Sequence, residues 1–276
     1  MSANMEILKR FQIRGAPGNV SRTSFDGRIV DFWSPENPTH LIIAHDGQNI
    51  FDKKSATMGQ TWELAQSAIR VSEDFNITPP AIIGVFHSST KKDSFGRIKD
   101  LAPQKPFLGG IPTLGPSKVE LSELRGDKYL AQIAQQIIPT ISKMIGLEPR
   151  CDKTALIGSS MGGLATLYGV GQYPELYGTA LAFSPHWVIG GNPLVDALID
   201  GLPEPGTHKL WMSRGTKGLD RSYTPYQDYA DMRAEELGWK VGHNFSTKVY
   251  DRTGHNERSW RKYLDEAIRF WMRTNT

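Results

Sequence analysis

Several features that would tie the chain to a particular compartment or partner are missing from the sequence. It contains one cysteine, Cys151, which leaves no second cysteine for an internal disulfide or a cysteine-based zinc site. No apolar run approaches the roughly 18 residues of a membrane span, and the N-terminal stretch lacks the apolar core of a secretory signal. The 32 Lys and Arg nearly balance the 29 Asp and Glu without a dense basic run, which argues against binding to nucleic acid or to an anionic membrane. These absences predict a cytoplasmic protein whose partner is a small molecule.

The pattern of apolar residues predicts an α/β fold with a mostly parallel central sheet. With 276 residues, of which 39% are hydrophobic, the chain can bury a large core. Short apolar runs predict strands at 40–45, 81–86, 154–158, 179–184 and 209–213, with 246–250 at an edge and two antiparallel strands near 11–14 and 28–33. Apolar residues spaced three and four apart predict helices at 62–71, 128–144, 161–172, 226–237 and 258–272. Because strands and helices alternate, we expect helices on both faces of the sheet.

One long segment, residues 88–127, interrupts this alternation. It is rich in glycine and proline and has little periodicity. A long segment of this kind inside a compact domain is typically functional, so we expect an inserted loop or lid within a single domain that spans residues 1–276. A linker between two domains is the alternative. Further along, Pro139 is expected to kink the helix at 128–144 or to end it early.

The strongest chemical signal is the pentapeptide Gly-Ser-Ser-Met-Gly at residues 158–162, which lies between an apolar strand and an apolar helix. This Gly-x-Ser-x-Gly context predicts a nucleophile elbow, in which Ser160 lies on a tight turn and the flanking glycines avoid steric clashes. The backbone N–H of Met161 and the start of the helix are then placed to stabilise an oxyanion. A phosphate-binding turn also joins a strand to a helix, but its glycine fingerprints are absent.

A catalytic serine requires a base and an acid, which in α/β-hydrolases follow it in the order acid, then histidine. His255 comes directly after the last expected strand and before the C-terminal helix, so it is the predicted base. Asp220, the first carboxylate after the strand at 209–213, is the predicted acid that orients the imidazole, and Asp251 is the alternative. His208 is expected at the opposite edge of the sheet, and His243 in an exposed turn.

A second polar loop, at residues 45–52, also follows an expected strand and contributes the other half of the predicted oxyanion hole. Gly47 gives this loop the freedom to point a backbone N–H inward, and we expect the N–H of Gln48 to act together with that of Met161. No His-Glu-x-x-His or other set of ligands at a useful spacing is present, so we expect no metal. The residues expected to contact the substrate are Asp46, His186 and Trp187.

With these residues in place, the chain resembles the "Putative esterase" family of α/β hydrolases, which includes esterase D type enzymes, enterochelin esterases, and feruloyl and acetyl xylan esterases. The resemblance is carried by HDGQNIFD at 45–52, RIKDLAP at 97–103, GSSMGG at 158–163, FSPHW at 183–187 and GHNERSW at 254–260. The sequence departs from the family pattern near the acid, because Lys217 and Gly218 follow the Gly-Thr pair where many members carry a carboxylate.

The resemblance implies a serine-dependent carboxylic ester hydrolase that needs no cofactor. Ser160 would be the nucleophile, His255 the base, and the N–H groups of Gln48 and Met161 the oxyanion hole, with a small acyl ester hydrolysed through an acyl-enzyme. An acyltransferase or a thioesterase of the same fold, or a catalytically silent member that binds a ligand, are the alternatives. A nucleotide-dependent oxidoreductase lacks support, because its glycine fingerprint is absent.

Overall fold

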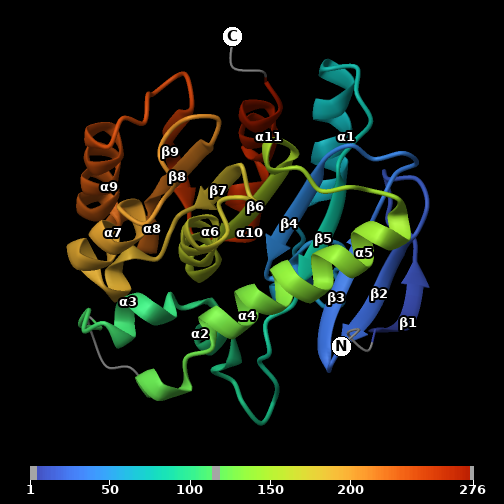
Figure 1. Cartoon of the computed structure of the whole chain (residues 1–276), viewed down its shortest axis with the longest axis horizontal. Coiled ribbons are helices and arrows are strands. Elements are labelled where there is room, and N and C mark those ends of the chain that lie inside the picture. Colours follow the sequence, from blue (N-terminus) through green and yellow to red (C-terminus); the bar gives the residue numbers. More distant parts are fainter. Residues whose placement is uncertain (1–4, 114–118, 274–276) are drawn as a thin grey trace.

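The computed structural model describes residues 5–113 and 119–273, which form one central sheet with helices on both faces (Figure 1). Within these residues the sheet has nine strands in the order β1-β2-β3-β5-β4-β6-β7-β8-β9. The pairs β1–β2, β2–β3 and β3–β5 are antiparallel. All later neighbours in this order, from the pair β5–β4 to the pair β8–β9, are parallel. A mostly parallel sheet is therefore confirmed.

The strands form where short apolar or alternating runs can be buried, and most of them coincide with the predicted ones. They are β1 Met5–Phe11, β2 Val20–Phe25, β3 Arg28–Trp33, β4 Leu41–His45, β5 Ala81–Val85, β6 Thr154–Ser159, β7 Thr179–Phe183, β8 Lys209–Lys217 and β9 Phe245–Gly254. The strand expected near 11–14 is wrong, since β1 ends at Phe11 and the next strand begins at Val20. The edge position of β9 is confirmed, although this strand extends four residues beyond the predicted end, to Gly254.

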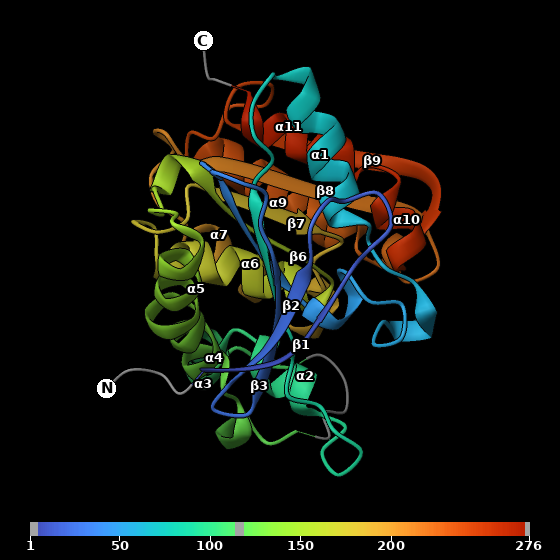
Figure 2. The same ribbon diagram turned by 90° about the vertical axis from the view of Figure 1, so that its right-hand side faces the viewer.

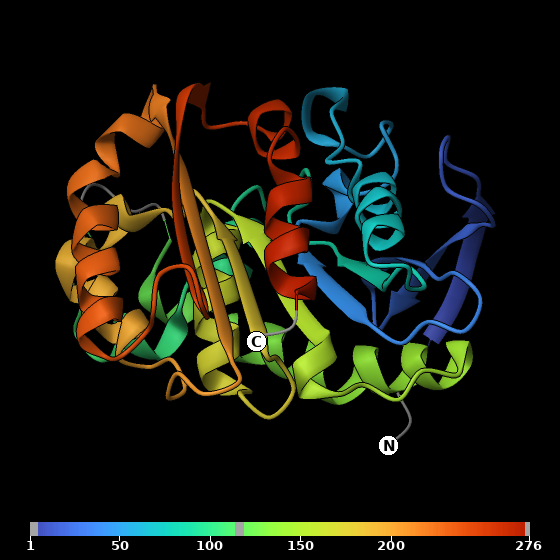
Figure 3. The ribbon, with the colours of Figure 1, turned by 90° about the horizontal axis from the view of Figure 1, so that it is seen from above.

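The helices cover two faces of the sheet and enclose two apolar cores. They are α1 Leu64–Asp74, α2 Gly96–Leu101, α3 Gln104–Leu108, α4 Gly126–Gln132, α5 Ile138–Ile145, α6 Met161–Gln172, α7 Gly191–Ile199, α8 Leu219–Ser222, α9 Thr224–Glu236, α10 Glu257–Arg261 and α11 Leu264–Met272. Helices α1, α10 and α11 pack on one face, and α4 to α7 with α9 pack on the other (Figure 2). Seen from above, α1 in cyan and α11 in red lie side by side, across the sheet from α5 in green (Figure 3). Among the described residues, no helix is long and apolar enough to cross a membrane.

The segment at 88–127 is more structured than its composition suggests. It contains α2, α3 and the start of α4, so part of the expected loop is helical, while residues 114–118 lie outside the described part. Helix α2 has only six residues and helix α3 only five, which is too few to give a visible apolar period in the sequence. Pro139 does not end its helix either: a π-helical turn, Ile133–Ile137, joins α4 to α5, which continues to Ile145.

The parallel strands place their carboxyl ends along one edge of the sheet. Asp46 follows β4, Ser160 follows β6, Ser184 follows β7, Asp220 comes shortly after β8, and His255 follows β9. Residues far apart in the sequence therefore meet at this edge, as expected for ligand sites in α/β folds. His208 directly precedes β8 and contacts the carbonyl of Pro174, which confirms its predicted place at the opposite edge.

Candidate active site

Ser160 occupies a strained turn between β6 and α6. Its φ of 57° and ψ of −122° lie outside the helical and extended regions that serine ordinarily adopts. The turn closes because Gly158 lies against Gly162: a Cβ on Gly158 would come within 2.5 Å of the Gly162 carbonyl oxygen. A Cβ on Gly162 would in turn meet Asp46 Oδ2 at 3.3 Å. The glycines are therefore required by close packing around the serine, as the pentapeptide predicts.

His255 and Asp220 lie in direct contact at the same edge of the sheet. The Nδ1 atom of His255 is 2.6 Å from Oδ1 of Asp220, and this carboxyl group has no exposed surface. The other oxygen of Asp220 accepts hydrogen bonds from the Gly215 backbone N–H at 2.7 Å and from the Ser184 hydroxyl at 2.9 Å. Trp260 Nε1 donates to the same hydroxyl at 3.0 Å. The carboxylate is thus fixed from several sides, which fixes the plane of the imidazole.

The alternative acid, Asp251, is in a different environment. Its side chain is 76% exposed, lies beside Arg252 and accepts a hydrogen bond from the Thr216 hydroxyl at 3.1 Å. The structure therefore brings Asp220, and not Asp251, to His255.

Ser160 and His255 share a neighbour that the sequence analysis did not single out. The ring of Tyr223 meets the ring of His255 edge to face at 5.5 Å. Burial raises the pKa of Tyr223, and its interaction with the Ser160 side chain opposes this rise, as a serine O–H directed at the tyrosine oxygen would. Among the described residues, no hydrogen bond joins Ser160 Oγ to His255 Nε2. Catalytic hydrogen bonds are often long without a substrate, so this geometry is compatible with a base that engages the serine during the reaction.

The loop after β4 carries the second predicted N–H donor. Gly47–Asn49 form a short 3-10 turn, in which the N–H of Gln48 is too close to the start to find an acceptor within the turn, and Met161 begins α6 in the same way. The reason for Gly47 differs from the predicted one. A Cβ there would lie 2.3 Å from the Gly84 carbonyl carbon of β5, so close packing requires the glycine, while the left-handed residue is Asp46, with a φ of 53°.

Asp46 is bound by an arginine from α2. Arg97 Nε donates to Asp46 Oδ1 at 2.8 Å and Nη2 donates to Oδ2 at 2.7 Å, a bidentate pair. Burial would raise the pKa of Asp46, but the charge and hydrogen bonds of Arg97 outweigh it and hold the pKa below its usual value. Both carboxylate oxygens are thus engaged by a guanidinium, so the structure makes Asp46 an anchor for its loop rather than the expected substrate contact.

The same loop is tied to the segment that follows His255. Asn49 Nδ2 donates to Glu257 Oε1 at 3.1 Å, and burial raises the pKa of Glu257. Together with Arg97 and Tyr223, Glu257 belongs to the site but escaped the sequence analysis. The signals for Arg97 and Glu257 were the stretches at 97–103 and 254–260 that carry the family resemblance; no local pattern marks Tyr223.

The two residues expected after β7 have different environments. His186 contacts the Tyr223 hydroxyl through Nδ1 at 2.6 Å, and its ring lies 6.5 Å from the ring of His255. Burial, followed by the charges of His255 and Arg97, lowers the pKa of His186 to about 4. Trp187 has no exposed surface and donates to Gln227 Oε1 at 3.0 Å, so the prediction that it contacts the substrate is wrong: it belongs to the core.

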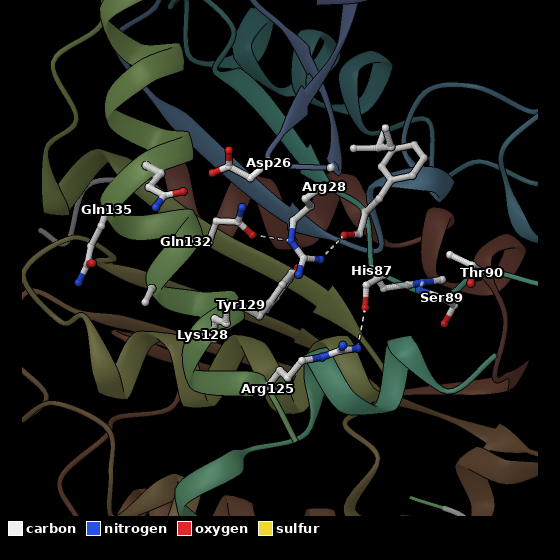
Figure 4. A pocket seen from close by; sticks show the side chains of 16 residues that line it. Asp26, Arg28, His87, Ser89, Thr90, Arg125, Lys128, Tyr129, Gln132 and Gln135 are labelled. Atoms are coloured by element: carbon white, nitrogen blue, oxygen red, sulfur yellow. Dashed lines mark hydrogen bonds between the residues drawn. The ribbon is translucent and has the colours of Figure 1, made fainter. Parts of the chain in front are cut away.

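A cavity of about 680 Å³ opens beside the carboxyl end of β5 (Figure 4). Its wall includes Arg28, Arg125 and Lys128 and the loop from Phe86 to Thr90, but no residue from β6, β8 or β9. Arg28 donates to Asp100 at 2.9 Å, and Arg125 donates to the Ser88 hydroxyl at 3.0 Å and lies 3.4 Å from the other oxygen of Asp100. Because Ser160, Asp220 and His255 do not line it, we assign this cavity no part in the chemistry at Ser160.

No group of three or more His, Cys, Asp or Glu side chains suited to a metal ion occurs in residues 5–113 and 119–273. The groups gathered at this edge of the sheet are a strained serine, a histidine fixed by a buried carboxylate, and backbone N–H groups at the starts of two turns.

Comparison with known proteins agrees with this geometry. A strand-to-helix serine followed by an acid and a histidine on later strands is typical of α/β-hydrolases, and the fold is that of this class. The model of the family described as "Putative esterase" matches residues 117–271, more than half of the chain, and the chain belongs to this family. The matched region includes Ser160, Asp220 and His255 but not the loop after β4.

Individual relatives are more distant. "Uncharacterized protein YbbA" of Bacillus subtilis (strain 168) is 29% identical over 93 residues, 33% of this chain and 36% of that protein. The enterobactin esterase FES from Shigella flexneri shares 15% identity at a TM-score of 0.62, over 98% of this chain and 59% of that one. The BES protein from Bacillus cereus shares 15% identity at a TM-score of 0.64, over 99% and 98% of the two chains. The chain thus matches less than two thirds of the length of YbbA and of FES, and the similarity to the solved structures establishes the fold.

Proposed function

We propose that this protein is a serine-dependent carboxylic ester hydrolase that acts on a small acyl ester through an acyl-enzyme. The observation that carries the proposal is the 2.6 Å contact between His255 Nδ1 and the buried Asp220, at the sheet edge that also holds the strained turn of Ser160. A histidine held in this way presents its free Nε2 as a base, because the carboxylate fixes the proton on Nδ1.

The proposed reaction has two halves. As Ser160 Oγ attacks the ester carbonyl carbon, His255 Nε2 takes the hydroxyl proton, and the N–H groups of Gln48 and Met161 stabilise the oxyanion. His255 then gives this proton to the departing alcohol, which leaves an acyl-serine. A water molecule loses a proton to His255 and attacks the acyl carbon, and the proton returns to Oγ as the acid is released.

Other observations support the same class of reaction. The family description is that of an esterase, and the solved structures of similar fold include the "Enterobactin and Salmochelin Hydrolase IroE". The proposed steps require only protein groups and water, so we propose no cofactor. The partner would be a small-molecule ester.

We also propose that residues 1–276 form one hydrolase domain. A single sheet runs through the described residues from β1 to β9, and α2, inside the segment at 88–127, supplies Arg97 to the loop of Gln48. This segment would therefore help to build the site, whether or not it also covers it as a lid.

The direct test combines turnover with covalent labelling. Wild type, Ser160→Ala and the exposed control Ser122→Ala would be assayed with p-nitrophenyl acetate, butyrate and octanoate. The mass of each intact protein would be measured after treatment with a fluorophosphonate. We expect wild type and the control to turn over and gain one adduct, whereas Ser160→Ala gains none and loses about 10⁶-fold in kcat.

Two other outcomes have clear meanings. A folded wild type that neither turns over nor reacts would contradict the proposal and leave a protein that binds a ligand on a hydrolase fold. Transfer of the acyl group to an added alcohol in preference to water would replace the hydrolase with an acyltransferase.

A further inference from the structure

The cavity of about 680 Å³ beside the carboxyl end of β5 has no role in the proposed reaction (Figure 4). Its volume lies within the range of cavities that hold small molecules, about 300 to 1,000 Å³. Because Ser160, Asp220 and His255 do not line it, a molecule bound here would occupy a second site. The side chains of its wall indicate which kind of molecule that would be.

The wall carries more positive than negative charge. Arg28 in β3, Arg125 just before α4 and Lys128 in α4 contribute three cations, and Asp26 contributes one carboxylate. Asp100, which has no exposed surface and contacts both arginines, adds a second carboxylate. Three cations against two carboxylates leave an excess of positive charge, which favours an anionic ligand.

Part of the hydrogen-bonding capacity of these cations is unused. Arg28 donates from Nε and Nη1, but its Nη2 has no acceptor among the described residues. Arg125 donates from Nη2 and pairs with a carboxylate through Nε, which leaves its Nη1 in the same state. Lys128 is exposed and forms no hydrogen bond or ion pair with another described residue. These N–H groups are available to a ligand.

Uncharged polar groups complete the wall. His87 Nδ1 accepts a hydrogen bond from the Ser89 backbone N–H at 3.1 Å, and burial lowers the pKa of His87, so near pH 7 the neutral ring carries its proton on Nε2. Along the helix that begins with α4, three glutamines line the cavity, Gln132, Gln135 and Gln136. An amide side chain both donates and accepts hydrogen bonds, which suits the hydroxyl groups of a ligand.

The loop that carries His87 is held in place from the side of α2. The Arg97 backbone N–H donates to Ser89 Oγ, and the Ser88 N–H donates to Asp100 Oδ2 at 2.8 Å. Gly96 packs so closely that a Cβ there would lie 2.5 Å from the Ser89 backbone nitrogen. A wall fixed in this way loses little conformational freedom when a ligand binds, which favours affinity.

We propose that this cavity is a binding site for a small polyhydroxylated molecule that carries one oxyanion, a phosphate or a carboxylate. The oxyanion would lie against the unused N–H groups of Arg28 and Arg125, because a guanidinium presents paired donors that match the oxygens of either group. Lys128 would add a further charge, and the hydroxyl groups would lie along the three glutamines. Figure 4 shows Gln132 and Gln135 to the left of Arg28 and the opposite wall, with His87, to its right.

Titration calorimetry of the full chain at low ionic strength would compare four probes: glucose 6-phosphate, gluconate, inorganic phosphate and glucose. Only the first two combine an oxyanion with hydroxyl groups. We expect at least one of them to bind about 10-fold more tightly than both inorganic phosphate and glucose, since an additional charged hydrogen bond contributes at least this factor. The stronger of the two distinguishes a phosphate from a carboxylate ligand. If neither binds more tightly than inorganic phosphate and glucose, the inference is wrong.

Two variants on the same helical segment locate the site. Lys128→Gln removes an exposed cation of the wall and should weaken binding of the stronger probe about 10-fold. Lys143→Gln, exposed on α5 and outside the cavity, is the matched control and should leave Kd unchanged. Equal affinities of these two variants would overturn the inference, and thermal unfolding would verify that both are folded.

Ser160→Ala separates this site from the proposed active site. It should bind the stronger probe as wild type does, because Ser160 does not line the cavity. Loss of binding in this variant would mean that the probe occupies the active site and would overturn the inference. A wild type that binds the probe but neither turns over an ester nor reacts with a fluorophosphonate would contradict the proposed function alone.

Discussion

The two sides of Ser160 are built from opposite kinds of chemistry. On the side of β4, Asp46 and Arg97 form a bidentate ion pair that fixes the backbone of the predicted oxyanion loop. On the side of β7 and β8, His186 and Tyr223 are uncharged rings that lie against the base. The ion pair fixes the backbone on one side. On the other side the uncharged rings add no charge of their own to that of the Asp220 carboxylate, which fixes the base.

The largest effect is expected from the carboxylate that fixes the base. Asp220→Asn should lower kcat by about 10⁴-fold, because an amide N–H in place of the carboxylate favours the wrong tautomer of the imidazole. Asp251→Asn is the matched control, because Asp251 is exposed and does not contact His255, and its kcat should stay within about twofold of wild type. Steady-state kinetics on the same p-nitrophenyl esters would decide, and a greater loss in Asp251→Asn would reverse the assignment of the acid.

The next effect concerns the charged side. Arg97→Met leaves Asp46 buried without its partner, which should cost about 3 kcal/mol of unfolding free energy and roughly 100-fold in kcat as the oxyanion loop loosens. In wild type the lowered pKa of Asp46 contributes stability above pH about 4, and this contribution is lost as the pH falls through the lowered value. In the variant, burial alone would raise that pKa, so the loss relative to wild type should be larger at pH 7 than at pH 4.5.

Urea unfolding at the two pH values measures this difference. The double variant Asp46→Asn/Arg97→Met is the comparison, since it removes the buried charge together with its partner and should recover part of the stability. A single variant as stable as wild type at pH 7 would mean that the ion pair does not hold the loop.

The smallest effect is a change in the pH dependence of stability on the neutral side. His186 has a pKa of about 4 in the folded chain, and an unfolded histidine titrates near 6.5, so between these values only the unfolded chain binds the proton. Its share of the stability is therefore present above pH 6.5 and is lost toward pH 4, by about 1 kcal/mol per pH unit. His186→Asn has no such proton to bind. Its unfolding free energy should fall less steeply than that of wild type over this range, and parallel curves would contradict the depressed pKa.

The sequence was sufficient for elements and residues whose signal is local. Ser160 is marked by its flanking glycines and by the apolar run of β6, and His255 by its place after the last strand. β2 was missed because its residues, VSRTSF, are half polar and give no apolar run, although alternate positions are buried. A strand covered on both faces is easier to detect than one covered on a single face.

The residues that the sequence did not reveal are those defined by contacts between distant segments. The pairing of Asp46 with Arg97 spans 51 residues, and that of His186 with Tyr223 spans 37. The prediction that Trp187 contacts the substrate was also a matter of packing. An aromatic side chain next to a histidine of the site can point into the core, and the sequence alone does not show which way it points.

Asp220 and Tyr223 lie on the same helical turn after β8, with the tyrosine N–H bonded to the carbonyl of the acid. An insertion or deletion of a single residue between them would rotate one of the two out of the site. The spacing of a carboxylate and a tyrosine three residues later therefore offers a criterion for comparing related sequences. Chains that keep this spacing should share the arrangement of the acid and the tyrosine beside the serine. In chains in which this turn has a different length, other residues should occupy the position of the tyrosine.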